Sequence, residues 1–373
     1  MNGELHARYY ATRQPIRISW DDGKIVSINH TTQQPQEDIW VAPPLFDLQI
    51  NGYAGVDFQQ DDVSAEDLLR AVRALRRDGC AYFFLTLITD EWPRLLTRLK
   101  RFRELRETSA ELREAIRGWH IEGPFLSARP GFHGAHHPQH MRDPRPEDIR
   151  ELRSATGIDP VLLTIAPERS GAMEAIELAI SAGIRVSLGH TNASAEILRA
   201  AVSAGATGFT HLANGCPREL DRHDNILIRV CDTERLTVSL IPDSIHVPAP
   251  AFRVLHRAVS GPIYYTTDAM AAAGAGPGRY RIGAVEVEVG ADQIVRQPGS
   301  TNFAGSALRP IDGVFRAAKM LNGPWQECWR RFSEAPAKFI GCQNELRVGS
   351  PATFCAIQFT NEQPSVRMLW DGS

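Results

Sequence analysis

The sequence lacks paired cysteines and long apolar runs. Its six cysteines are scattered and form no C-x-x-C pair, so zinc knuckles and thioredoxin-like motifs are absent, and we interpret the thiols as small buried side chains. No apolar run approaches the roughly 18 residues that would span a bilayer. The first ten residues, MNGELHARYY, contain no apolar segment typical of a signal peptide. We therefore expect a cytoplasmic protein with no membrane partner.

A strong net charge is missing as well. The chain has 41 Lys and Arg against 44 Asp and Glu, a formal charge of −3, which provides no bulk attraction to nucleic acid or anionic lipid. The densest basic segments, 73–79 and 98–107, interleave charged with apolar residues in a pattern typical of solvated helix faces. The sequence thus predicts a globular protein with no nucleic-acid partner.

Eight short apolar runs alternate with amphipathic helical patterns through the middle of the chain. The runs are LFDLQI (45–50), AYFFLTLI (81–88), GWHIEG (118–123), PVLLTIAP (160–167), IRVSLGH (184–190), ATGFTH (206–211), LTVSLIPD (236–243) and PIYYTTDA (262–269). Eight β and α units in alternation favour an α/β fold of the TIM-like (β/α)8 barrel type. An open doubly wound sheet is the alternative, but no G-x-G-x-x-G motif follows the first strand.

Both chain ends have a different sequence pattern, with short β-favouring stretches separated by turn signals. We predict that residues 1–42 and 340–373 pair into one small β-sandwich module, and that residues 43–339 form the barrel that carries the chemistry. Residues 281–300 indicate an extra hairpin, placed either over the barrel or in the β module.

Polar side chains stand at the ends of several of these apolar runs, where a buried parallel strand should be apolar. They are Gln49, Glu122, His190, His211, Asp243 and Asp268. In a barrel the C-terminal ends of all strands meet on one face, which holds the active site. Glu122, His190 and His211 suit one divalent ion, with Zn²⁺ favoured and Fe²⁺ or Co²⁺ able to use the same ligands. Asp268 is predicted to be a general base, or alternatively a structural cap of the following turn.

The segment 131–140, GFHGAHHPQH, has four histidines in ten residues. A metal-binding tract is one interpretation. The flanking glycine and proline indicate a loop, so we favour a substrate-contacting loop with one functional histidine.

Several motifs follow one another in order along the chain: FDLQINGYAGVDF, HIEGPFLS, GAHHP, SLGHTNAS, THLANGCP, IPDSIHV, TTDAM and FAGSAL. This set resembles the N-acetylglucosamine-6-phosphate deacetylase family of the amidohydrolase superfamily, and EAPAKFIG…NELRVGSPATF resembles the closing segment of that family. They run in order from about Pro43 to Leu308. The resemblance implies a barrel with a small β-sandwich, and hydrolysis of the N-acetyl group of N-acetylglucosamine 6-phosphate.

The resemblance also implies roles for individual residues in the reaction. Glu122, His190 and His211 would bind the catalytic metal. Asp268 would act as general base and acid, and His246 would polarise the amide carbonyl. Both assignments carry over from the motifs TTDAM and IPDSIHV.

Substrate binding is assigned in the same way. His136 matches the loop histidine that contacts the sugar, and Asn214 with the backbone at Gly215 falls at the phosphate end. Arg222 aligns with an arginine that reaches the phosphate of the neighbouring subunit, which implies a homodimer.

Three segments depart from the family pattern. Asp47-Leu48-Gln49 stands where many amidohydrolases have His-x-His, so we expect a single tightly held ion, with Mn²⁺ also possible. Asn214-Gly215-Cys216 replaces Asn-Ala-Met, and His223-Asp224-Asn225 replaces Glu-Pro-Gly. Both latter changes lie in the phosphate region. The alternatives are another amidohydrolase, acting on a different amide or an unphosphorylated amino sugar, and a non-catalytic sugar-binding protein.

Overall fold

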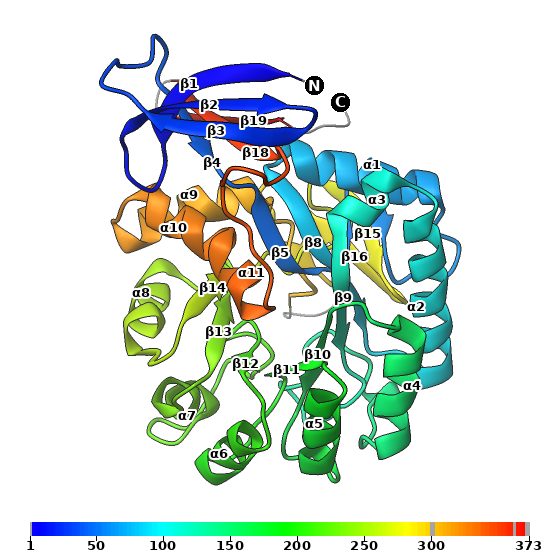
Figure 1. Ribbon diagram of the computed structural model, residues 1–373. Coiled ribbons are helices and arrows are strands. Elements are labelled where there is room, and N and C mark those ends of the chain that lie inside the picture. Colours follow the sequence, from blue (N-terminus) through cyan, green and yellow to red (C-terminus); the bar gives the residue numbers. More distant parts are fainter. Residues whose placement is uncertain (1, 299–302, 361–362, 370–373) are drawn as a thin grey trace.

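Eight parallel strands form the centre of the computed structural model, which describes residues 2–298, 303–360 and 363–369. The strands are β5 (Leu45–Ile50), β8 (Cys80–Ile88), β9 (Ile116–Glu122), β10 (Val161–Ile165), β11 (Arg185–Leu188), β12 (Gly208–Phe209), β13 (Thr237–Leu240) and β14 (Ile263–Tyr265). They lie side by side in chain order, and each overlaps one of the eight apolar runs. The predicted barrel is therefore confirmed (Figure 1).

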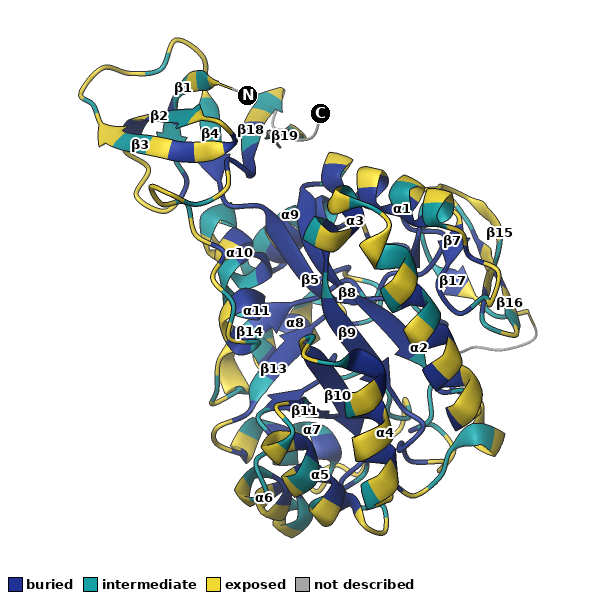
Figure 2. Ribbon diagram, turned by 45° about the vertical axis from the view of Figure 1, so that its right-hand side comes forward, coloured by how far each residue is buried: buried dark blue, intermediate teal, exposed yellow. Residues whose placement is uncertain are grey.

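Helices surround this sheet and expose only their outer faces (Figure 2). They are α1 (Ala65–Arg77), α2 (Trp92–Glu107), α3 (Ala110–Ala115), α4 (Pro146–Thr156), α5 (Ala172–Ser181), α6 (Ala195–Ser203), α7 (Ile226–Asp232), α8 (Ala249–Ala258), α9 (Pro310–Leu321), α10 (Trp325–Phe332) and α11 (Glu334–Phe339), with a 3-10 turn at Pro138–His140. Ser64 caps α1 in a capping box with Asp67. Gly79, which follows α1 at φ +81°, lets the chain turn directly into β8. Within the described ranges, no helix is long and apolar enough to cross a membrane.

The first and last strands of the barrel, β5 and β14, meet through side chains and the segment that follows β14. Asp47 on β5 is fully buried and accepts hydrogen bonds from the hydroxyls of Thr266 and Thr267. The backbone N–H of Asn51 donates to the carbonyl of Ala269 at 2.7 Å. Burial raises the pKa of Asp47 to about 6, against the lowering effect of these hydrogen bonds. This seam brings the segment after β5 beside the segment after β14.

Both chain ends pair in a six-stranded sheet above one end of the barrel (Figure 1). Its order is β19-β18-β4-β1-β2-β3, made of β1 (Gly3–Tyr9), β2 (Pro15–Asp21), β3 (Lys24–His30), β4 (Ile39–Ala42), β18 (Phe354–Thr360) and β19 (Gln363–Leu369). Trp20 on β2 and Phe354 on β18 are not on neighbouring strands, yet their rings lie 5.4 Å apart. The sheet is therefore curved around its own core, and the two ends form one β module.

The extra hairpin lies over the barrel rather than in the β module. It consists of β15 (Gly278–Ile282), β16 (Val285–Val289) and β17 (Val295–Arg296), and it packs on the segment after β14. Residues 299 and 300 of the predicted range lie outside the described residues. A two-stranded ribbon, β6 (Gly52–Tyr53) with β7 (Val56–Asp57), follows β5.

Candidate active site

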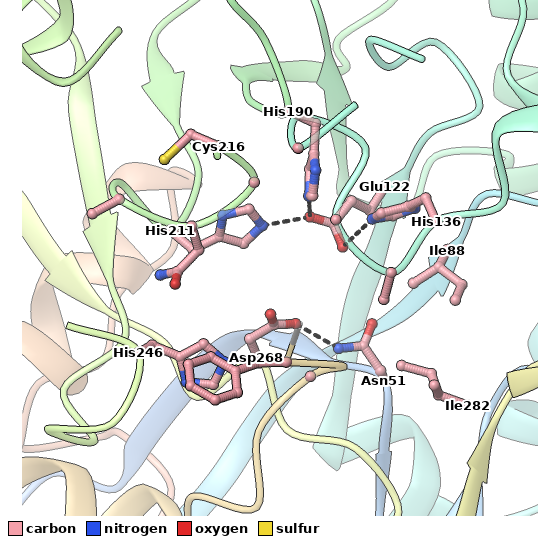
Figure 3. Close-up of a pocket in the computed structure, with 18 of the residues that line it drawn as sticks. Asn51, Ile88, Glu122, His136, His190, His211, Cys216, His246, Asp268 and Ile282 are labelled. Carbon is pink, nitrogen blue, oxygen red and sulfur yellow. Dashed lines mark hydrogen bonds and ion pairs between the residues drawn. The ribbon is translucent and has the colours of Figure 1, made fainter. Parts of the chain in front are cut away.

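A cavity of about 250 Å³ lies at the C-terminal ends of the barrel strands (Figure 3). Glu122 is the last residue of β9, and His190 and His211 come two residues after β11 and β12. Asp268 follows β14 by three residues. The structure thus brings these four side chains, far apart in sequence, to the wall of one cavity.

Three imidazoles face the Glu122 carboxylate, which is 2% exposed. His211 Nε2 lies 2.8 Å from Oε1 and His190 Nε2 lies 3.4 Å from the same oxygen. His136 Nε2 lies 3.6 Å from Oε2. Burial opposes the charge on Glu122, but hydrogen bonds from His190 and His211 outweigh it and hold the pKa of Glu122 well below its usual value.

Two of the three imidazoles, those of His190 and His136, are held in place by contacts of their second nitrogens. His190 Nδ1 lies 2.8 Å from the carbonyl oxygen of Phe132, and His136 Nδ1 lies 2.9 Å from Thr89 Oγ1. Such bonds direct Nε2 of each ring into the cavity, as metal-binding histidines require. Burial lowers the pKa of His136 to about 3, so its ring is neutral near neutral pH. A neutral ring has a lone pair available for a metal.

These residues fit a divalent metal. Ligand atoms of Glu122, His136 and His190 all lie within 4.8 Å of one another, and His211 Nε2 contacts the same carboxylate. One carboxylate with imidazole nitrogens is a donor set suited to Zn²⁺ and its neighbours in the first transition row.

Three site residues have strained backbones. His190, His211 and Asp268 have φ values of +49°, +30° and +52°, in the left-handed region that non-glycine residues rarely adopt. Strain of this kind is retained where the surrounding structure enforces it, often at functional sites. Here each strained residue follows a barrel strand and has its side chain at the cavity.

Asp268 lies across the cavity from Glu122 and the rings of His136 and His190 (Figure 3). It accepts hydrogen bonds from Gln49 Nε2 at 3.0 Å and from Asn51 Nδ2 at 2.7 Å. Gln49 Nε2 also lies 3.0 Å from Glu122 Oε2. Burial, followed by the charge of Glu122, raises the pKa of Asp268 to about 6.

His246 reaches the cavity from the segment after β13. Its Nδ1 lies 2.5 Å from Asp243 Oδ2, and Oδ1 of the same carboxylate accepts the backbone N–H groups of Ile245 and His246 at 2.8 Å. This carboxylate fixes the orientation of the ring and leaves Nε2 for other partners. The ring of Phe303 packs edge-on against His246, with centroids 5.0 Å apart.

The segment 213–218 forms another wall of the cavity. Asn214, Gly215 and Arg218 line it, and the buried Nδ2 of Asn214 finds no hydrogen-bond partner among the described residues. Arg222 is exposed and is not among the described residues lining the cavity of its own chain.

An eight-stranded parallel barrel whose strand ends carry histidines and carboxylates around one cavity is the architecture of the amidohydrolases. No family model matches the chain. N-Acetylglucosamine-6-phosphate deacetylase of Vibrio furnissii is 29% identical over 99% of this chain and 94% of its own length. The enzyme of that name from Bos taurus is 31% identical over 85% of this chain and 79% of its own length.

A solved structure is similar to this chain over nearly its whole length. It is a mutant N-acetyl-D-glucosamine-6-phosphate deacetylase from Mycobacterium smegmatis in complex with N-acetyl-D-glucosamine-6-phosphate. It superimposes with a TM-score of 0.86 at 28% identity, over 96% of this chain and 94% of that one. The chain belongs to the N-acetylglucosamine-6-phosphate deacetylase family.

Several site residues had no assigned role in the sequence-based prediction. Asp243 was among the polar strand ends, but its pairing with His246 was not predicted. Asn51 has a signal, because it stands two residues after Gln49 and so shares its side of an extended chain. Phe303 has a signal as the first residue of the motif FAGSAL, whereas Arg218 has none that separates it from ordinary loop residues.

Proposed function

We propose that this protein hydrolyses the N-acetyl group of N-acetylglucosamine 6-phosphate to give acetate and glucosamine 6-phosphate. The observation that carries the proposal is the position of Asp268 across the cavity from the cluster formed by Glu122 and the histidines. A proton-transferring carboxylate beside a set of metal-binding side chains is the arrangement that amide hydrolysis needs.

The proposed ligands of one Zn²⁺ ion are Glu122, His190 and His211, and their convergence at 2.8–3.4 Å supports this set. When bound, a divalent ion supplies Lewis acidity, which makes water a stronger nucleophile and polarises an amide carbonyl. His136, held beside Glu122 by Thr89, is proposed to contact the sugar.

The chain's own residues move the protons. Asp268 takes a proton from the attacking water while the water oxygen bonds to the acetyl carbon. His246 holds Nδ1–H against Asp243 and, as the doubly protonated ring, donates from Nε2 to the carbonyl oxygen, where negative charge develops. The carbon–nitrogen bond then breaks, and Asp268 returns the proton to the departing amine.

Asn214 and the backbone at Gly215 are proposed to hold the phosphate end of the sugar, with Arg222 reaching it from the partner subunit of a homodimer. The exposure of Arg222, which leaves its side chain free to extend toward another subunit, supports this arrangement.

We further propose that residues 43–339 form the catalytic domain and that residues 1–42 with 340–373 form a separate β module. The six-stranded sheet formed by the two chain ends supports this division into two units.

We also propose a cytoplasmic location, because a phosphorylated sugar does not cross membranes unaided.

The test is acetate release by the purified protein after loading with one equivalent of Zn²⁺. We expect equal amounts of acetate and free amine from N-acetylglucosamine 6-phosphate, and loss of both after chelation. Zn²⁺-, Fe²⁺- and Co²⁺-loaded samples that all bind this sugar without releasing acetate would favour a sugar-binding protein instead.

A further inference from the structure

The cavity wall contains a guanidinium that the proposed function has not used. Among the described residues that line the cavity, Arg218 is the one lysine or arginine. Its side chain is exposed, whereas Glu122 and Asp268 stand deeper on the same cavity. The guanidinium attracts an anionic substituent, so the favoured place for one on this wall is beside Arg218.

Packing of the segment 213–218 fixes the position of the Arg218 backbone. Gly215 has φ +61° and lies so close to His190 that a Cβ added there would stand 2.7 Å from Nδ1 of the ring. Pro217 packs on Gly131 just as closely, since a Cβ on Gly131 would stand 2.6 Å from that of Pro217. The segment is therefore braced on both sides immediately before Arg218.

A second donor on the same segment points to a ligand independently. The buried Nδ2 of Asn214 has no hydrogen-bond partner among the described residues, although Asn214 lines the cavity. A buried donor without a partner is costly, and an acceptor oxygen of a bound ligand removes that cost. Asn214 and Arg218 thus offer two donors along one wall.

We propose that Arg218 is a specificity-determining residue that binds the phosphate of the substrate within its own subunit. This inference rests on the proposed deacetylase function and adds to the contact proposed for Arg222 of the partner subunit. Each subunit then has a cation for the phosphate on its own cavity wall, so recognition does not depend on the subunit interface alone.

The experiment compares kcat and KM for N-acetylglucosamine 6-phosphate and for N-acetylglucosamine, with Zn²⁺-loaded protein. In Arg218→Gln we expect KM for the phosphorylated sugar to rise about tenfold to a hundredfold with little change in kcat, because binding to the phosphate contributes equally before and during the reaction. The preference for the phosphorylated sugar should fall by the same factor. Arg218→Lys should recover part of it, since the charge is retained.

Arg199→Gln is the matched control, because it removes one exposed positive charge from α6 without touching the cavity lining. It should leave the preference unchanged. A preference in Arg218→Gln equal to that of the wild type would overturn the proposal, whatever the preference of Arg222→Gln. Failure of the wild type to release acetate from either sugar would instead overturn the deacetylase function itself.

Discussion

Gln49 and Asp268 are hydrogen-bonded across the seam between the first and last strands of the barrel, with 3.0 Å between Gln49 Nε2 and Asp268 Oδ1. The same nitrogen lies 3.0 Å from Glu122 Oε2, while Gln49 Oε1 accepts from Thr210 Oγ1 at 3.1 Å. One buried amide thus links the carboxylate on β9 to the carboxylate after β14. Gln49 occupies the position where many amidohydrolases have a histidine, and here it acts as a donor between two acids.

Replacing Gln49 by leucine should therefore disturb both carboxylates. A hydrogen bond to a charged group contributes about 1.5–3 kcal/mol, so we expect kcat to fall roughly tenfold to a hundredfold in Gln49→Leu. The measurement is steady-state acetate release together with the zinc content. Gln358→Leu is the control, because Gln358 also donates to a carboxylate, that of Glu37, but from an exposed position on β18 of the β module. Equal kcat values in both variants would show that the Gln49 bridge has no catalytic consequence.

Gly215 should be needed for the position of His190. In Gly215→Ala the new Cβ would stand 2.7 Å from His190 Nδ1, too close unless the ring moves. We expect weaker zinc binding, measured by competition with a chelator. Gly341→Ala is the control, because Gly341 has φ +78° but open space around the added Cβ. Zinc binding weakened equally in both variants, relative to the wild type, would be explained by backbone strain alone. The contact with His190 would then have no role.

The barrel could be predicted from the sequence because buried parallel strands produce short, mostly apolar runs that are easy to recognise. The eight runs are mostly apolar, since both faces of each strand are covered, and the candidate site residues stand at or just after the strand ends, whereas Asp47 and His120 lie within their strands. Glu122, His190, His211 and Asp268 could be found in this way without any knowledge of the loops.

The remaining contacts depend on loops and on closure of the sheet, which have no periodic signal. The position of His136 beside Glu122 follows from the bond to Thr89 and from the path of residues 131–137. The bonds from Asp47 to Thr266 and Thr267 exist because β5 and β14 meet. The family resemblance singles out Arg222, whereas the structure places Arg218 on the cavity wall of its own chain, because that depends on where the segment is braced.

Asp243 should act through His246. In Asp243→Asn the amide side chain loses the charge that orients the ring at a distance of 2.5 Å, and buried orienting groups of this kind typically contribute about tenfold to a hundredfold in activity. We expect the loss in kcat rather than in KM, because the carbonyl oxygen gains negative charge only during the reaction. A rise in KM with kcat unchanged would show that His246 contributes only to substrate binding.

His256 should make the fold sensitive to acid. Its Nε2 accepts from Arg331 Nε at 3.0 Å, and burial together with the charge of Arg331 lowers its pKa to about 4. The unfolded chain takes up this proton near pH 6.5, before the folded chain does, so the stabilisation is complete above pH 6.5 and is lost as the pH falls towards 4. Because the ring is only partly buried, we expect a loss of about 1 kcal/mol.

Urea unfolding midpoints at pH 7 and pH 4.5 measure this effect. His256→Gln keeps an acceptor for Arg331 but does not titrate, so its midpoint should fall less than that of the wild type. The exposed His30→Gln should behave like the wild type. Identical pH dependence in all three proteins would contradict the assignment.

The most direct test of the central claim is acetate release from N-acetylglucosamine 6-phosphate by Asp268→Asn with its zinc content measured in the same sample. The asparagine retains the size of the side chain but cannot take the proton of water or return it to the amine. We predict one zinc per chain, as in the wild type, with kcat lower by about 10²–10⁴-fold. A zinc-loaded Asp268→Asn protein with near-normal kcat would contradict the account.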